Sequence, residues 1–165
     1  MTSQENLMKA FAGESQANRR YLAFAKKADE DGFKQVAKLF RAAADAETVH
    51  ALRHFKVAGG IKDTKENLKE AVAGETYEMN EMYPEMIKLA EEENNSEALL
   101  SFKGAHAAEK IHAELYKEAL ESVESGSDLP EKELYVCQVC GHTVHEVPDT
   151  CPICGVPKEQ FKKIE

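Results

Sequence analysis

The 165-residue sequence contains no tryptophan, and aromatic residues make up only 7% of it. It also has no basic excess, because 30 acidic side chains against 21 basic ones give a net charge of −9. Such an acidic chain is not expected to bind nucleic acid or an anionic membrane. No apolar run approaches the roughly 18 residues of a membrane span. The N-terminus also lacks the basic segment followed by an apolar segment that is typical of a secretory signal. We therefore expect a cytoplasmic protein with neither nucleic acid nor membrane as a partner.

Cysteine is absent from the chain before Cys137, and all four cysteines lie in the C-terminal part. In a cytoplasmic chain they are expected to be thiols, and clustered thiols indicate a metal site. They form two CxxC pairs, each followed by glycine: Cys137 with Cys140, and Cys151 with Cys154. Two such pairs predict a tetrahedral four-thiolate site for iron or zinc. The spacing does not choose between the metals, and a structural zinc ribbon is the alternative.

Alanine, glutamate, lysine and leucine are abundant, which favours helix. Four long helical patterns run over about 3–31, 33–58, 64–94 and 96–125, with Thr64 and Ser96 as candidate N-caps. Short connections favour antiparallel neighbours in an up-down four-helix bundle, although helices exchanged between two chains fit the same pattern. Pro84 lies within the third pattern and predicts a kink or a break there.

A polar linker, SGSDLPEKE, follows the fourth helical pattern. The helical periodicity ends there, and the remaining chain is rich in cysteine, valine and proline. We therefore expect a four-helix bundle over residues 1–128 and a small metal-binding domain over residues 132–165.

The apolar stripe of each predicted helix carries one glutamate near its middle: Glu14, Glu47, Glu75 and Glu109. The third stripe continues through Met82, Met86 and Leu89. The interval between the first two glutamates and the interval between the last two differ by a single position. The first and second halves of the helical region therefore carry one pattern twice.

Two of these glutamates are followed three residues later by a histidine, His50 or His112, which places each pair on one helix face. A single Glu-x-x-His is usually solvated, but four unpaired carboxylates at one level of a core would be very costly. One Glu from each of two helices plus Glu-x-x-His from the other two is the ligand set of a dimetal site, suited to iron or manganese. Glu78 adds a fifth carboxylate one turn after Glu75.

The motifs FAGESQAN, ETVH, GETYEMNEMYPEM, EKIH and CQVCG…CPICG closely resemble those of the rubrerythrin family, over nearly the whole chain. The resemblance implies an all-α ferritin-like four-helix bundle with a di-iron site of two ions, followed by a rubredoxin-like domain whose four cysteines hold one iron. By this resemblance the di-iron ligands are Glu14, Glu47, His50, Glu75, Glu78, Glu109 and His112.

The resemblance also assigns finer roles. One iron would move between His50 and Glu78 as its oxidation state changes. Tyr21 and Tyr83 match tyrosines close to the metals, although a plain core role for Tyr21 is an equal alternative. The other histidines receive no ligand role and are interpreted as core or surface residues: His54, His106, His142 and His145.

The function implied by the resemblance is a cytoplasmic peroxidase that protects against oxidative stress by reducing hydrogen peroxide to water. Its electrons would come from NAD(P)H through separate redox proteins, such as rubredoxin or a reductase, and would pass from the four-cysteine iron to the di-iron site. A head-to-tail homodimer is implied, in which each tail serves its partner. The alternatives are a ferroxidase or iron-storage protein, a non-catalytic electron-transfer or zinc module, and an enzyme that also reduces dioxygen.

Overall fold

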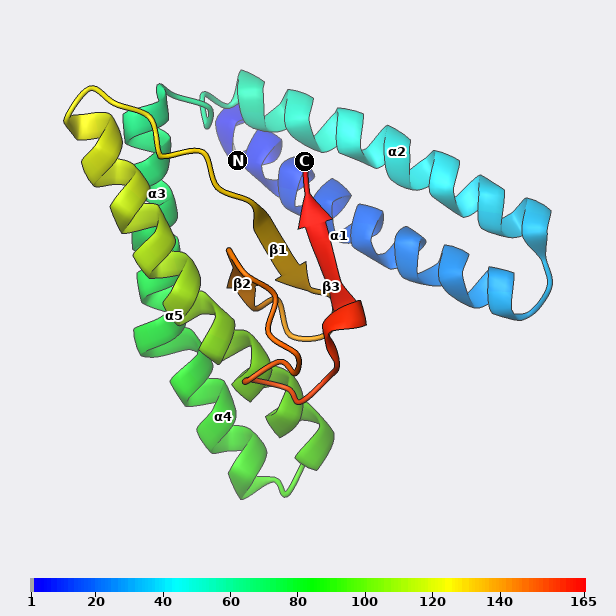
Figure 1. Cartoon of the computed structure of the whole chain (residues 1–165). Helices are drawn as coiled ribbons and strands as arrows, with labels where there is room; N and C mark the ends of the chain where they lie inside the picture. The colour runs from blue at the N-terminus through cyan, green and yellow to red at the C-terminus, as the bar shows by residue number, and fades with distance from the viewer. Residues whose placement is uncertain (1) are drawn as a thin grey trace. The chain divides into compact units, whose positions relative to one another are not determined.

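The computed structural model describes residues 2–165 (Figure 1). It contains two compact units, of which the first ends at Lys62 and the second spans Asp63–Glu165. The first unit consists of helices α1 (Ser3–Glu30) and α2 (Lys34–Val57). The helices of the second unit are α3 (Thr64–Tyr77), the π-helical turn η1 (Glu78–Met82), α4 (Tyr83–Glu92) and α5 (Ser96–Glu124). Its short elements are β1 (Leu134–Cys137), β2 (Thr143–Val144), the 3₁₀ turn η2 (Lys158–Gln160) and β3 (Phe161–Ile164).

The first unit is an antiparallel helix pair (Figure 1). A capping box starts α1, in which Thr2 Oγ1 accepts from the backbone N–H of Glu5 and Glu5 Oε2 accepts from that of Thr2. The buried residues of both helices are alanines: Ala17, Ala25, Ala28, Ala37, Ala44 and Ala51. Small side chains allow the two backbones to approach closely. A polar link crosses the pair where Asn18 Nδ2 donates to Ala44 O at 2.7 Å.

The N-caps of α3 and α5 lie one residue earlier than the sequence predicted. Asp63 Oδ1 accepts from the backbone N–H of Glu66 at 2.9 Å, and Asn95 Oδ1 accepts from that of Ala98 at 3.1 Å. Thr64 and Ser96 are therefore the first helical residues, not the caps. The short Asp and Asn side chains reach the third helical N–H from these positions, which satisfies one orphan donor of each helix.

Pro84 neither ends the helix nor leaves it regular, because the chain forms the π-helical turn η1 just before it. The N–H of Tyr83 donates to the carbonyl of Glu78, five residues back. In this wide turn the missing N–H of Pro84 would have faced the carbonyl of Met79, also five residues back. His106 Nε2 on α5 donates to that carbonyl instead, at 2.8 Å. A histidine to which the sequence assigned no role thus satisfies the group that proline leaves unpaired.

Replacing His106 with leucine is expected to destabilise the protein by about 1–3 kcal/mol, because the half-buried carbonyl of Met79 loses its donor. Urea unfolding followed by circular dichroism would measure the loss. His106→Gln keeps a side-chain N–H and should recover part of the stability. Equal stability losses for both variants would show that ring packing, not the hydrogen bond, is what His106 contributes.

The small C-terminal sheet has the strand order β2-β1-β3, with both pairings antiparallel. In β1, Tyr135 pairs with Val144 on one side and with Lys163 on the other. The largest fully buried side chains of the described residues are Cys137 and Cys151. Apart from Cys137, every residue of the three strands is at least partly exposed, so the core of this sheet is small.

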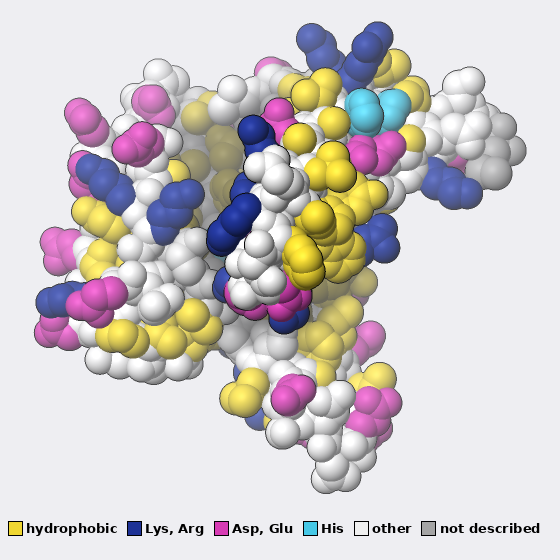
Figure 2. Space-filling view, turned by 90° about the vertical axis from the view of Figure 1, so that its right-hand side faces the viewer, with side chains coloured by type: hydrophobic (Ala, Val, Ile, Leu, Met, Phe, Trp, Pro, Cys, Tyr) yellow, Lys and Arg dark blue, Asp and Glu magenta, His cyan; other side chains and the backbone are white. Residues whose placement is uncertain are grey.

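Large apolar side chains lie at the surface among charged ones (Figure 2). Leu39 is 68% exposed and Leu100 is 75% exposed, whereas the fully buried positions in helices are alanines. Among the residues that the structure describes, no helix has the length and apolar character to cross a membrane.

Candidate metal centres

The first unit brings together three of the predicted ligands: Glu14 from α1, and Glu47 and His50 from α2. One ligand atom of each lies within 4.8 Å of the others. His50 Nδ1 is 2.9 Å from Glu47 Oε2, and this hydrogen bond lowers the pKa of Glu47. The spacing of three residues on α2 makes this contact possible, as the sequence predicted.

The second unit repeats the arrangement with Glu75 from α3, and Glu109 and His112 from α5, again within 4.8 Å. His112 Nδ1 is 2.7 Å from Glu109 Oε2 and 3.7 Å from Glu75 Oε2. Burial, followed by the neighbouring Glu109 carboxylate, raises the pKa of Glu75 to about 7. Each cluster thus has the same composition, with one glutamate from the first helix of a pair and Glu-x-x-His from the second.

The residues of the second cluster fit a bound metal cation. Glu75 Oε2 is buried and has no hydrogen-bond partner, and a second carboxylate lies beside it. An orphaned buried oxygen of this kind is costly unless a cation neutralises it. Carboxylate oxygens together with imidazole nitrogens suit iron or manganese. The donor set therefore fits the metal that the sequence predicted.

The remaining predicted residues lie around these clusters. Glu78 is not among the three grouped ligands of the second cluster; burial and then the Glu109 charge raise its pKa. Tyr83 follows η1, and its ring lies 6.4 Å from that of Phe102. Burial, followed by the charge of Glu109, raises the pKa of Tyr83. Tyr21 packs between aromatic rings in the first unit, 6.2 Å from the ring of Phe40.

A contact that sequence spacing could not predict joins His112 to the C-terminal sheet. His112 Nε2 is 3.0 Å from Thr143 Oγ1, and the Thr143 hydroxyl donates to Gly141 O at 3.1 Å. Because the hydroxyl proton is used in that second bond, the hydroxyl oxygen accepts from Nε2–H. This fixes the tautomer of His112, so that Nδ1 presents a lone pair on the side of the carboxylates, where it could bind a metal cation together with them. The two residues are 31 apart in sequence, and no spacing rule connects them.

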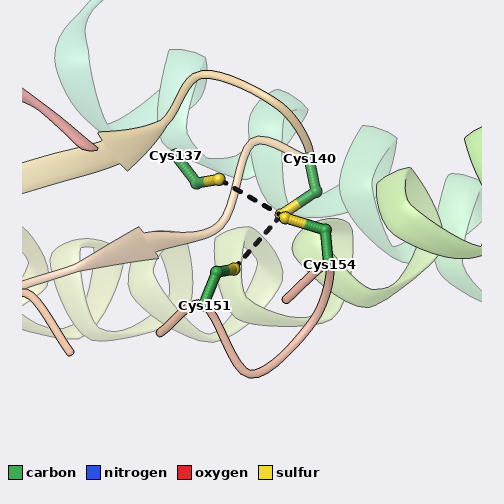
Figure 3. A group of neighbouring side chains, drawn as sticks. All are labelled: Cys137, Cys140, Cys151 and Cys154. Carbon is green, nitrogen blue, oxygen red and sulfur yellow. Dashed lines mark hydrogen bonds between the residues drawn. The ribbon is translucent and has the colours of Figure 1, made fainter. Parts of the chain in front are cut away.

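The four cysteines converge from two loops (Figure 3). Cys137 Sγ is 3.7 Å from Cys154 Sγ, and Cys140 Sγ is 3.6 Å from Cys151 Sγ. A tetrahedral metal with bonds of about 2.3 Å to sulfur separates its ligands by about 3.8 Å, whereas a disulfide needs about 2 Å. The spacing therefore fits a four-thiolate metal site and not two disulfides.

The glycine after each CxxC pair closes a matching turn. Gly141 has φ +81° and Gly155 has φ +75°, a region that other residues rarely adopt. Each glycine N–H donates to the carbonyl of the first cysteine of its pair at 2.9 Å. Burial opposes ionisation of Cys137, but the backbone N–H groups of Cys140 and Val139 lower the pKa of its thiol to about 7. These backbone groups thus favour the thiolate of Cys137, whereas burial raises the pKa of the Cys140 and Cys154 thiols.

Small residues on α5 let the cysteine loop approach the helix. A Cβ atom built on Gly104 would lie 3.5 Å from Cys140 Cβ, and one built on Gly141 would lie 3.7 Å from Ala108 Cβ. Gly104, Ala108 and His112 follow one another at four-residue intervals, so they share a face of α5. The loop that carries Cys140 and Thr143 therefore packs along this face within one chain.

A cavity of about 450 Å³ lies in the second unit. Apolar side chains of α3, α5 and the segment after residue 128 form much of its lining, and Glu75, His112 and Thr143 also line it. A small molecule therefore has room beside the second cluster.

Known proteins that are similar to this chain support both kinds of metal site, the Glu-Glu-His clusters and the four-cysteine cluster. The Rubrerythrin family model matches residues 5–120, and the model "Rubrerythrin, rubredoxin-like domain" matches residues 135–162. The chain belongs to the rubrerythrin family. Rubrerythrin-2 of Clostridium acetobutylicum is 36% identical over 171 residues, covering 94% of this chain and 93% of that protein. Nigerythrin of Nitratidesulfovibrio vulgaris is 37% identical over 173 residues, covering 95% of this chain and 84% of nigerythrin.

A solved structure of nigerythrin in a partially reduced state is also similar. Its TM-score is 0.58 at 34% sequence identity, and the match covers 99% of this chain and 87% of that one. Together with the helices and the four-cysteine cluster, this confirms the predicted fold class of a ferritin-like helical part with a small rubredoxin-like domain. Membership of the rubrerythrin family, together with the donor sets described above, confirms the predicted cofactors, a di-iron site and an iron at four cysteines.

Membership of the rubrerythrin family also makes the chain a di-iron oxidoreductase of oxidative-stress defence. The individual ligands and the domain bounds, 1–128 and 132–165, stay predictions. The rubredoxin-like match at residues 135–162 lies within the predicted second domain.

The raised pKa of Glu75 predicts how pH affects this rubrerythrin-family chain when it is free of metal. The ordinary pKa of Glu75 is 4.5 and the folded value is about 7. Between these values the unfolded chain releases a proton that the folded chain keeps, so stability falls as pH rises. Urea midpoints of chelator-treated protein should therefore fall from about pH 5 to about pH 8 more steeply than those of Glu75→Gln. Parallel pH profiles for the two proteins would contradict this.

Proposed function

We propose that the protein is a non-haem di-iron peroxidase that reduces hydrogen peroxide to water. One peroxide takes up two electrons and two protons and gives two waters. The proposal includes an electron path from the four-cysteine iron to the di-iron site. The observation that supports it most directly is the hydrogen-bonded link from His112 through Thr143 to Gly141, next to Cys140.

The two Glu-Glu-His clusters are proposed to supply the di-iron ligands, with Glu78 as the extra carboxylate. When bound, two ferrous ions supply the two electrons and the Lewis acidity that the cleavage of an O–O bond needs. The cavity beside the second cluster supports access for peroxide, since its volume of about 450 Å³ exceeds that of a small polar molecule.

Protons have a candidate donor in Tyr83. Burial and the nearby carboxylates raise the pKa of its hydroxyl, so the group is protonated at neutral pH. The raised pKa makes the hydroxyl a weaker acid than an ordinary tyrosine, so it would give its proton only to a strong base such as a developing hydroxide and recover it from solvent. Tyr21, in the first unit, is proposed to lie close to the metals in the same way. Its packing against Phe24 and Phe40 is equally compatible with a core role.

The electron path has short steps within the second unit. Cys140 is followed directly by Gly141, whose carbonyl accepts from Thr143, and Thr143 accepts from the proposed ligand His112. Hydrogen bonds and covalent bonds thus connect the four-cysteine site with the second cluster without a gap. These contacts lie in one chain, whereas the resemblance implied that each tail serves its partner.

The upstream partners belong to the same proposal. Electrons would arrive from NAD(P)H through separate carriers, such as rubredoxin or a reductase, and would enter at the four-cysteine iron. The proposal also includes a cytoplasmic homodimer, with the electron path within each chain and not from each tail to its partner, as the head-to-tail form implied by the resemblance would have it. The large apolar side chains exposed on the helices, such as Leu39 and Leu100, support an association that covers them.

Stopped-flow absorbance tests the activity. Iron-loaded protein is reduced without oxygen and mixed with one equivalent of peroxide or of dioxygen, and the colour of the oxidised four-cysteine iron is followed. We expect fast return of colour with peroxide and slow return with dioxygen. Equal rates, or no return with peroxide, would show that the proposal is wrong. Oxidation of added Fe(II) with retention of a mineral would support iron storage instead.

Two matched variants test the electron path. Thr143→Val keeps the side-chain shape but loses the hydroxyl, so colour should return about 10-fold to 100-fold more slowly with peroxide. Thr143→Ser keeps the hydroxyl and should stay close to the unmodified protein. Equal rates for the two variants would exclude this hydrogen-bonded route.

A further inference from the structure

His142 is the one polar side chain that is buried among the residues the structure describes, with 8% of its surface exposed. It follows Cys140 by two residues, and the functions discussed so far give it no task. Buried polar groups require partners, because an unpaired one is costly. The partners of His142 therefore indicate what it does.

Three contacts tie His142 to three of the four cysteines. Its side-chain Nδ1 lies 3.7 Å from Cys151 Sγ. Its backbone N–H donates to the sulfur of Cys140, and its carbonyl accepts from the backbone N–H of Cys137 at 2.9 Å. The residue thus contacts both cysteine loops, one through its backbone and the other through its ring.

The ring orientation is fixed by packing. The imidazole packs against the Phe161 ring at the start of β3 in a T-shaped arrangement, with ring centroids 6.1 Å apart and planes at 69°. Cys151 is 1% exposed, so water does not compete for its sulfur. Nδ1 is therefore held beside this sulfur in a dry environment, where hydrogen bonds are electrostatically strong.

The chemistry of the sulfur decides the direction of the hydrogen bond. A metal-bound cysteine is a thiolate, which accepts and cannot donate. Nδ1 must therefore carry the proton. An iron with four thiolates has a net charge of −1 when ferric and −2 when ferrous. A donor beside one sulfur stabilises the more negative ferrous form more strongly, and hydrogen bonds to sulfur are a known control of iron–sulfur potentials.

We propose that His142 donates its Nδ1–H to the Cys151 thiolate and thereby raises the reduction potential of the iron held by the four cysteines. His142 is a positioning and tuning residue, not a ligand. The inference concerns only the ferric/ferrous couple of the four-cysteine iron. It does not depend on whether the protein reduces peroxide.

The test is an anaerobic redox titration of the purified iron-loaded protein, read from the visible absorbance of the ferric four-cysteine site. His142→Phe keeps a planar ring but removes the donor. At a fixed ambient potential, its ratio of ferrous to ferric iron should fall about tenfold, which corresponds to about 59 mV for one electron. His142→Asn places an amide N–H at about the position of Nδ1 and should recover most of the potential.

A matched control is His145→Phe, because His145 Nδ1 lies 2.9 Å from the carbonyl of Glu133 and the ring belongs to the same segment. This variant should leave the potential unchanged. If His142→Phe fails to retain iron, Phe161→Leu provides a second test, since loss of the ring that holds His142 should lower the potential in the same direction. Unchanged potentials in the iron-loaded variants of His142 and Phe161 would overturn the proposal, as would an equal fall in His145→Phe.

Discussion

Cys151→Ser is expected to remove the iron of the rubredoxin-like site and to unfold the strands around it. Cys151 and Cys137 are the largest fully buried side chains of the described residues, and the sheet has little other core. Domains of fewer than about 40 residues usually need a metal or disulfides to fold. For comparison, structural zinc in short finger peptides contributes about 10–16 kcal/mol. The visible colour should vanish, and amide exchange in β1 and β3 should become fast.

The helices of this variant should stay folded, because their hydrogen bonds and caps do not involve the cysteines. If the proposed peroxidase activity and electron path are right, peroxide turnover should fall by at least about 100-fold, since the proposed electron supply of the di-iron site is lost. Val139→Ser changes a 59% exposed residue in the other cysteine loop and serves as the control, with colour and turnover retained. A coloured and active Cys151→Ser protein would refute both the ligand assignment and the electron path.

Glu109→Gln is expected to empty the second metal cluster while leaving the fold intact. Glu109 contacts His112 at 2.7 Å, and its charge raises the pKa of Glu75. The amide has the same shape but is a poor iron ligand. Bound iron measured by metal analysis should fall below the three ions expected from the cofactor assignment, and peroxide turnover should drop by more than about 100-fold. The colour of the four-cysteine iron should remain.

The same change should stabilise the metal-free protein near neutral pH. Removing the charge of Glu109 removes a cause of the raised pKa of Glu75, so the carboxylate costs less to bury. Urea unfolding of chelator-treated protein would show this as a higher midpoint. Glu121→Gln, at an exposed position of the same helix, is the control and should change neither iron content nor midpoint. Full iron content in Glu109→Gln would contradict its assignment as a ligand.

Much of this architecture could be predicted because it depends on local spacing. Three residues between Glu47 and His50, or between Glu109 and His112, determine which side chains share a helix face. The CxxCG pairs determine the cysteine loops in the same way. Neither pattern depends on where a helix ends. The structure brings each Glu-x-x-His pair together with the glutamate of the preceding helical segment, and the four cysteines with one another.

The sequence also did not reveal a change of helical register in the third helical segment. Met86 and Leu89 were expected on the apolar stripe of the third helical segment, but they are 37% and 54% exposed, while Ala90 is buried. The π-helical turn η1 adds a residue to the helix, which rotates everything after it by about 100°. A constant period of 3.6 residues cannot reveal such a shift. Pro84 indicated an irregularity, but not that the irregularity was a wider turn.

The sequence also did not predict the contacts between segments that are distant along the chain. His112 and Thr143 are 31 residues apart, and His106 reaches a backbone carbonyl 27 residues before it. Neither pairing leaves a trace in sequence spacing, because both depend on how elements pack. The sequence assigned no role to three histidines that have hydrogen-bond partners in the structure: His106, His142 and His145. In each case the partner is distant in sequence and is brought close by packing.

The π-helical turn also explains why the two halves of the helical region are unequal by one residue. The stretch from Glu14 to the end of α1 is one residue shorter than the stretch from Glu75 to the end of α4. From those ends to the second glutamate of each half, the lengths are equal. The connections 31–33 and 93–95 have the same length, and Glu47 and Glu109 occupy the same position in α2 and α5, counted from the start of each helix.

The connecting turns match in their hydrogen bonds as well. The N–H of Phe33 donates to Ala28 O at 2.8 Å, and the N–H of Asn95 donates to Ala90 O at 2.9 Å. Each bond spans five residues and closes the end of the first helix of its pair. The length difference therefore lies within the helical segment that contains η1.

Had the two halves descended from one ancestral helix pair, a single codon gained in this segment, or lost from its counterpart, would account for the difference. Such a change would leave the loops and the Glu-x-x-His helix untouched. It would give one half a helical register of its own around an otherwise duplicated set of ligands, with Tyr21 and Tyr83 displaced by that one residue from each other.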